Sequence, residues 1–191
     1  MAILHGDADI SPTKPELLAT WVPAQPWFTG DAADLQHLGA YRFDDPAGEV
    51  GIETHLVRAG DGPVLQVPWT YRGAPLDGAE QFLVGTMDHT VLGQRWIYDA
   101  IGDPVYQAVL ATTILTGGSQ AELVRELADG SSTIVEPSVR VTGSGAGSPT
   151  APVDLEVVRV LGGTPPEGDE TLTGTWAEAP DPVVLAVARL R

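Results

Sequence analysis

The segment from residue 85 to residue 99 brings a histidine, an arginine, two acids and two aromatic side chains within fifteen residues. A mixture of this kind can line a polar pocket that holds a small molecule. The residues that we predict as ligand-binding are Asp88, His89, Arg95 and Asp99, with Trp69 from an earlier segment. The alternative is a structural hairpin in which Arg95 pairs with Asp88 or Asp99 and Trp96 lies in the core.

Other common chemistries are excluded by residues that the chain lacks. Phosphoryl transfer needs cations at the phosphates, but the chain has a single lysine, Lys14, ahead of the first predicted helix. It has no asparagine, which a kinase catalytic loop requires, and no cysteine for disulfide or thiolate chemistry. The four histidines (His5, His37, His55 and His89) do not have the spacing of zinc ligands. We therefore predict no catalytic residue, no metal and no cofactor.

Two glycine motifs only superficially resemble functional loops. Residues 117–121 (GGSQA) have the loose form of a nucleophile elbow, but a predicted helix precedes them where the elbow requires a strand. Residues 143–148 (GSGAGS) lead into Pro149 and not into a helix N-terminus that could hold phosphate. We interpret the first motif as a helix end followed by a turn and the second as a flexible linker.

The composition limits which partners the protein can bind and where in the cell it is expected. With a net charge of −16 and no cluster of basic residues, the chain should repel nucleic acids and anionic membranes. The first ten residues do not form a secretory signal, and the longest apolar run, residues 183–188, is too short to cross a bilayer. We expect a cytoplasmic protein with one core, and the sequence leaves its oligomeric state open.

Sixteen prolines and 22 glycines favour short strands joined by turns over long helices. One helix should begin after Ser11 or Thr13, with Glu16 in its first turn, and end before Pro23. A second should begin at Asp103–Pro104 and end at residues 117–118.

Period-two alternation predicts strands over residues 38–43, 50–56 and 64–71, and a strand pair over residues 81–87 and 91–98. Pro68 has no N–H to donate, so its strand should be an edge strand or contain a bulge. Residues 120–127 could be helical, but a hairpin turning at Asp129–Gly130 is slightly favoured. Residues 153–161, 171–176 and 183–190 should add C-terminal strands.

Three ordered blocks of sequence resemble the N-terminal cap domain of maltokinases and, more closely, short stand-alone proteins that consist of such a cap. They are residues 16–28 (ELLATWVPAQPWF), 67–76 (VPWTYRGAPL) and 85–104, which begins with GTMDH and ends with YDAIGDP. The resemblance covers about residues 1–118 and implies an α+β fold, a cystatin-like curved antiparallel sheet packed by helices. Residues 119–191 would be a β-rich extension on the same core. No catalytic residue can be transferred, because none belongs to the cap.

Three functions remain open. The first is a non-catalytic accessory or regulatory protein of maltose, trehalose or α-glucan metabolism, with a sugar kinase or an α-glucan enzyme as partner. The second is a protein that binds a sugar or a nucleotide, with stacking faces from Trp21, Trp27, Trp69 and Trp96. The third is an unrecognised enzyme built from Asp88, His89 and Asp99, which requires these side chains to converge on one pocket.

Overall fold

The computed structural model describes residues 2–5, 9–126, 131–148 and 150–191, which form three β-sheets and two α-helices. The main sheet has six strands in the order β2-β6-β7-β5-β4-β3. Their bounds are Ile10–Ser11 (β2), Leu35–Phe43 (β3), Gly51–Ala59 (β4), Val64–Arg72 (β5), Leu83–His89 (β6) and Gly93–Asp99 (β7). Every pairing in this sheet is antiparallel. The expected α+β class, with a curved antiparallel sheet, is confirmed.

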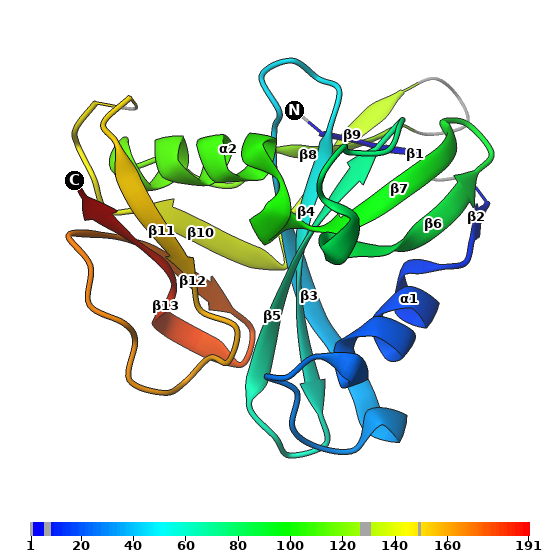
Figure 1. Ribbon diagram of the computed structural model, residues 1–191, viewed down its shortest axis with the longest axis horizontal. Helices are drawn as coiled ribbons and strands as arrows, with labels where there is room; N and C mark the ends of the chain where they lie inside the picture. Colours follow the sequence, from blue (N-terminus) through cyan, green and yellow to red (C-terminus); the bar gives the residue numbers. More distant parts are fainter. Residues whose placement is uncertain (1, 6–8, 127–130, 149) are drawn as a thin grey trace.

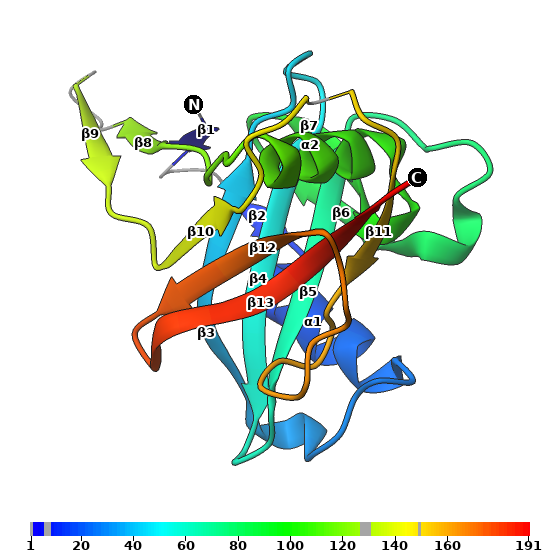
Figure 2. The same ribbon diagram turned by 90° about the vertical axis from the view of Figure 1, so that its left-hand side faces the viewer.

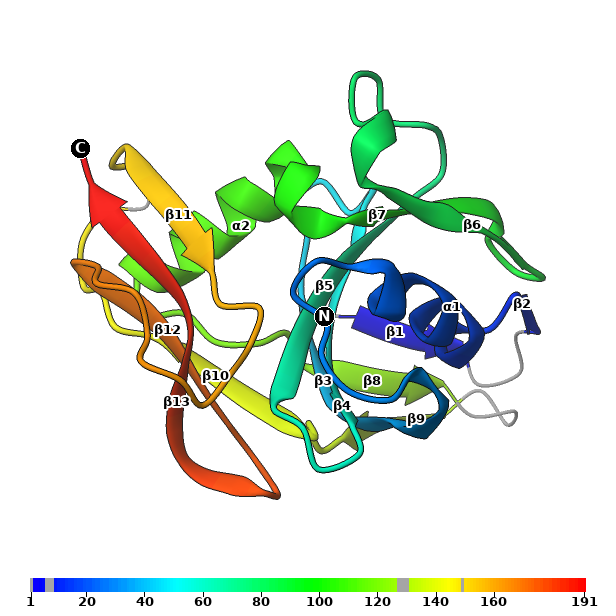
Figure 3. The same cartoon turned by 60° about the horizontal axis from the view of Figure 1, so that its bottom comes forward.

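The main sheet curls around helix α1 (Lys14–Trp21), with β6 and β7 on one side of the helix and β3 and β4 on the other (Figure 3). The helix begins as predicted, because Thr13 and Glu16 form a reciprocal capping box that satisfies N–H groups of the first turn. A short 3₁₀ turn over Val22–Ala24 follows it. The capping box thus fixes the first turn of α1, which begins with Lys14.

Strand β4 is buried on both faces, and its alternating side chains enter two different cores. Ile52 and Leu56 belong to an outer core, and Val57 belongs to an inner core against α1. Glu53 and His55 are four and two positions before Val57, so their side chains point to the same face of β4 as Val57 does. Strand β4 thus places two titratable side chains, Glu53 and His55, on the concave side of the sheet.

Helix α2 (Pro104–Leu115) and a second sheet cover the outer side of β3, β4 and β5 (Figures 1 and 2). Asp103 caps α2 as predicted. The second sheet has the order β10-β12-β13-β11, with bounds Val139–Gly143, Glu170–Trp176, Ala179–Leu190 and Val153–Val157 respectively. Buried Gln66 of β5 donates hydrogen bonds to the carbonyl oxygens of Val158 and Leu185, at 2.9 and 2.8 Å. The C-terminal strands are thus joined to the main sheet through a shared core.

A third sheet has the order β1-β8-β9, with bounds Ala2–His5, Leu123–Glu126 and Ser132–Val135. Strands β8 and β9 pair antiparallel, so the hairpin favoured for this region is confirmed. Its expected turn at Asp129–Gly130 lies outside the described residues. Strand β1 pairs with β8 in parallel, a long-range pairing that no local pattern predicts.

The expectation of an edge strand at Pro68 is wrong, because β5 lies between β4 and β7. On this side of β5, pairing with β7 begins only at Trp69. Earlier in β5 the neighbour is a short C-terminal segment, in which Val160 forms an isolated β-bridge with Leu65. Pro68 therefore lies where one neighbour ends and the other has not begun. An interior strand tolerates a proline there because no ladder hydrogen bond is required of it.

The interpretation of residues 143–148 as a flexible linker is also wrong. The N–H groups of Gly145 and Gly147 donate to the carbonyl oxygens of Ile114 and Leu115 at the end of α2, at 2.9 and 2.8 Å. A Cβ on Gly143 would lie 2.1 Å from the carbonyl oxygen of Thr113, and one on Gly145 would lie 2.4 Å from that of Leu115. The glycines therefore permit close backbone contact with the helix.

Neither α-helix in the described part of the chain has the length and apolar character needed to span a membrane.

Candidate functional site

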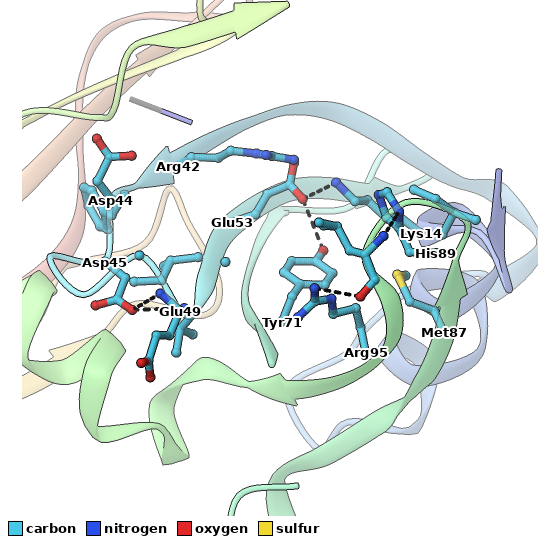
Figure 4. A pocket seen from close by; sticks show the side chains of 17 residues that line it. Lys14, Arg42, Asp44, Asp45, Glu49, Glu53, Tyr71, Met87, His89 and Arg95 are labelled. Carbon is cyan, nitrogen blue, oxygen red and sulfur yellow. Dashed lines mark hydrogen bonds and ion pairs between the residues drawn. The ribbon is translucent and has the colours of Figure 1, made fainter. Parts of the chain in front are cut away.

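The first cleft, of about 540 Å³, opens where the curled sheet meets the start of α1. Its floor comes from β4, β5 and the β6–β7 hairpin, and the loop after β3 forms one wall (Figure 4). Apolar side chains such as Ile10, Ile52 and Met87 contribute to the lining. The polar groups at its inner end are Lys14, Arg42, Glu53, Tyr71, His89 and Arg95.

Glu53 is the centre of the polar network, with only 8% of its surface exposed. Its Oε1 accepts hydrogen bonds from Nε and Nη2 of Arg42 at 3.2 and 3.1 Å. Its Oε2 pairs with Nζ of Lys14 and accepts the hydroxyl of Tyr71 at 3.1 Å. Burial alone would raise the pKa of Glu53, but His55, Lys14 and Arg42 together hold that pKa well below its usual range. Glu53 is thus a carboxylate that holds two cations at the cleft.

Two histidines continue the network away from the cleft. Nε2 of His55 lies 3.1 Å from the Tyr71 hydroxyl, and Nδ1 of His55 lies 3.2 Å from Nε2 of His37. Burial lowers the pKa of His55 to about 4, so its imidazole is neutral at neutral pH. Because Tyr71 donates its proton to Glu53, His55 must donate from Nε2 to Tyr71 and accept at Nδ1 from His37. The hydrogen bonds therefore run in one direction, from His37 through His55 and Tyr71 to Glu53.

The structure places His89 and Arg95, both predicted ligand-binding residues, together in the first cleft. Nδ1 of His89 accepts the N–H groups of Val91 and Leu92, each at 3.2 Å, which fixes the ring over the β6–β7 turn. Nη2 of Arg95 donates to the carbonyl oxygen of Leu92 at 2.8 Å. The alternative in which Arg95 pairs with Asp88 or Asp99 is therefore not what the structure shows.

The other predicted residues lie elsewhere. Asp88 is exposed on β6 and lines neither of the two clefts described here. Trp69 is 0% exposed, packed against Trp21 and His55, so it offers no surface to a ligand. Asp99 is buried and lines a second cleft. The three groups of the enzyme hypothesis, Asp88, His89 and Asp99, therefore do not converge on one pocket.

The second cleft, of about 760 Å³, lies between the end of α1, helix α2 and strand β11. Asp99 accepts from Nη2 of Arg159 with both carboxylate oxygens, at 2.5 and 2.6 Å. The guanidinium of Arg159 also lies over the ring of Trp27, 5.3 Å from its centroid, and covers one of its faces. Trp21 and Trp27 thus line a different cleft from His89 and Arg95, which separates the aromatic and polar groups that the sugar-binding hypothesis combined.

The residues that sequence reasoning missed as site residues are Lys14, Arg42, Glu53 and Tyr71. Their signal was weak but present: Glu53 and His55 interrupt an alternating strand at positions on its inward side. Charged residues at such positions require buried partners, and Lys14 and Arg42 supply them from α1 and β3. That the partners come from other elements could not be seen in the sequence.

Comparison with known proteins adds one match. Residues 21–103 match the family model described as the maltokinase N-terminal cap domain. The comparison with curated proteins finds no match. The matched residues begin at the last residue of α1, end at the cap of α2 and include strands β3 to β7. Over strands β3 to β7 of the main sheet, the chain thus resembles the maltokinase N-terminal cap domain.

Proposed function

We propose that this chain is a non-catalytic accessory or regulatory protein of maltose, trehalose or α-glucan metabolism. It acts in the cytoplasm through a protein partner, either a sugar kinase or an α-glucan enzyme. One observation carries the proposal: the family match covers five of the six strands of the main sheet, β3 to β7, which lie between α1 and α2 in the sequence. A domain described as a cap belongs with a catalytic part, so a chain that resembles the cap is expected to work beside an enzyme.

The outer edge of strand β6 is the surface that best suits such a partner. Strand β2 has only two residues and pairs with β6 only at Asp88 and His89. No other described strand pairs with that edge toward Leu83. An open edge can accept an extended segment of another protein as an added strand. Leu83 and Val91, at the two ends of the β6–β7 hairpin, are 42% and 58% exposed and add apolar contact area.

The test is capture of a partner followed by reconstitution with purified proteins. The immobilised chain should retain one kinase or α-glucan enzyme from a cytoplasmic extract, and light scattering should give a complex of fixed stoichiometry. Adding the chain should then change the activity of that enzyme. Failure to form a stoichiometric complex, or an enzyme whose activity does not respond, contradicts the proposal.

A matched pair of variants tests the surface. Thr86→Lys places a charge on the open edge of β6, where it should weaken the complex because edge charges oppose strand addition. Thr112→Lys makes the same change at an exposed position of α2 and should leave the complex intact. Equal effects of the two variants would show that the partner does not use the β6 edge.

A further inference from the structure

The first cleft brings together three cations of an acidic protein, although four acids, Asp44, Asp45, Glu49 and Glu53, also line it. The chain has ten basic residues against 26 acidic ones. Three of the ten, Lys14, Arg42 and Arg95, line this one cleft. Figure 4 shows them arranged around Tyr71 and coming from α1, β3 and β7. Nearby cations repel one another in a partly desolvated site, so holding three of them in one cleft costs free energy that a bound anion would offset.

The inner end of the cleft has more positive than negative charge. Glu53 is shared by Lys14 and Arg42, so this triad has one positive charge in excess. Burial lowers the pKa of Lys14 although Glu53 pairs with it, which reflects the cost of holding its charge there. The side chains of Lys14 and Arg42 remain 26% and 20% exposed, so a ligand can reach them.

Arg95 adds a second excess charge. It makes no ion pair with any described residue, and its Nη2 donates to a neutral carbonyl oxygen, that of Leu92. Its Nε is buried and has no hydrogen-bond partner among the described residues. The Arg95 side chain also lines the cleft, where a charged guanidinium can donate to an oxyanion.

The acidic residues of the cleft lie at its opposite end. Asp45 accepts the N–H groups of Ala47, Glu49 and Val50 with its two oxygens, so it is engaged by its own loop. Asp44 and Glu49 are exposed. In Figure 4 these acids lie to one side of Glu53, and Lys14 and Arg95 lie to the other. The cleft is therefore polarised, with a cationic inner end and an acidic outer end that can accept hydroxyl groups.

We propose that the first cleft binds a small organic oxyanion, a carboxylate or a phosphate ester that carries hydroxyl groups. Its charged group lies between Lys14, Arg42 and Arg95, and its hydroxyl-bearing part points toward exposed Glu49. The cleft volume of about 540 Å³ suits a ligand of one or two sugar rings in size. This inference goes beyond the accessory role and does not depend on a partner protein.

Three probes with the same carbon skeleton test it: glucose 6-phosphate, gluconate and glucose. Each is titrated into the full chain at constant low ionic strength and followed by calorimetry and by NMR shifts. At least one of the two anions should bind and shift the signals of Tyr71 and Arg95, and glucose should not. Which anion binds more tightly distinguishes a phosphate site from a carboxylate site. Absence of binding by both anions, or equal binding of glucose, overturns the proposal.

Arg95→Gln should weaken binding of the anion about tenfold or more, because it removes a charged donor from the site. Arg140→Gln makes the same change in charge on β10, at an exposed arginine outside the cleft, and should bind as the wild type does. Lys14→Gln is a second variant of the site in case Arg95→Gln does not fold, as judged by circular dichroism. Wild-type affinity in both cleft variants, or equal losses in Arg140→Gln, would overturn the assignment.

Discussion

Arg159 and Asp99 form an ion pair that joins the C-terminal region to the main sheet. Nη2 of Arg159 lies 2.5 and 2.6 Å from the two carboxylate oxygens of Asp99, and the side chains are only 12% and 9% exposed. The two residues are sixty positions apart in the sequence. Because β7 ends at Asp99, the pair fixes the end of that strand against the segment after β11.

Asp99→Asn should lower the free energy of unfolding by about 3 kcal/mol, since it leaves the guanidinium of Arg159 buried without a counter-charge. Urea denaturation followed by tryptophan fluorescence measures the change. Asp154→Asn is the control, because Asp154 and Arg191 form an exposed pair and the denaturation midpoint should stay close to that of the wild type. Equal midpoints for the two variants would show that the Asp99 pair does not stabilise the fold.

Glu53→Gln should lower the free energy of unfolding at pH 7 by about 3 kcal/mol, because Lys14 and Arg42 lose the charge that they share. The wild type should also lose stability as the pH falls below about 4.3, the ordinary pKa of glutamate. The reason is that the folded protein holds the pKa of Glu53 lower than the unfolded chain does, so acid favours unfolding.

Urea denaturation at a series of pH values tests both parts of the Glu53 prediction. Below about pH 4.3, the stability of Glu53→Gln should fall less steeply than that of the wild type. Glu178→Gln removes the carboxylate of an exposed pair with Arg58 and should keep the wild-type slope. A slope that is the same in all three proteins would contradict the role of Glu53.

His55 should titrate near pH 4, which NMR of its ring protons can measure. Burial lowers this pKa, so the unfolded chain binds a proton more readily than the folded one between about pH 6.5 and pH 4. Stability contributed by neutral His55 is complete above about pH 6.5 and falls by up to about 1.4 kcal/mol per pH unit below it. His55→Gln should flatten that slope. A His55 that titrates at its ordinary pKa would refute the buried, neutral assignment.

Gly143→Ala should lower the free energy of unfolding by about 2 to 3 kcal/mol, because the new methyl group would lie 2.1 Å from the carbonyl oxygen of Thr113. Gly163→Ala is the matched control: no atom lies within 4 Å of its added Cβ, and the expected change is within about 0.5 kcal/mol. Thermal denaturation compares the two. If Gly143→Ala were as stable as Gly163→Ala, the glycine run would be a loose connection after all.

The sequence was most informative where a local rule decides the structure. Thr13 and Glu16 predicted the start of α1, and Asp103 with Pro104 predicted that of α2, because caps depend only on nearby residues. Period-two alternation also predicted the strand that became β4. The prediction of an edge strand from Pro68 was wrong because the neighbour of β5 changes along the strand. That change depends on tertiary pairing, which the local sequence does not encode.

The candidate site was only partly predictable for the same reason. His89 and Arg95 are close in sequence and share the first cleft. Asp99 ends the same strand, but it lines the second cleft, where it pairs with Arg159 from a distant segment of the sequence. The partners of Glu53 likewise come from other elements: strand pairing places Arg42 of β3 opposite Glu53, and the packing of α1 brings Lys14 to it.

The β6–β7 hairpin has two surfaces with different proposed uses. Its inner face carries His89 and Arg95 in the first cleft, and its outer side is the open edge of β6. An anion in the cleft and a strand added at the edge would therefore act on the same short element. If the anion alters the affinity for the partner by some factor, the partner alters the affinity for the anion by the same factor. Through the hairpin, the concentration of a metabolite would then control how much of the enzyme is in the complex, and formation of the complex would change how tightly the metabolite binds.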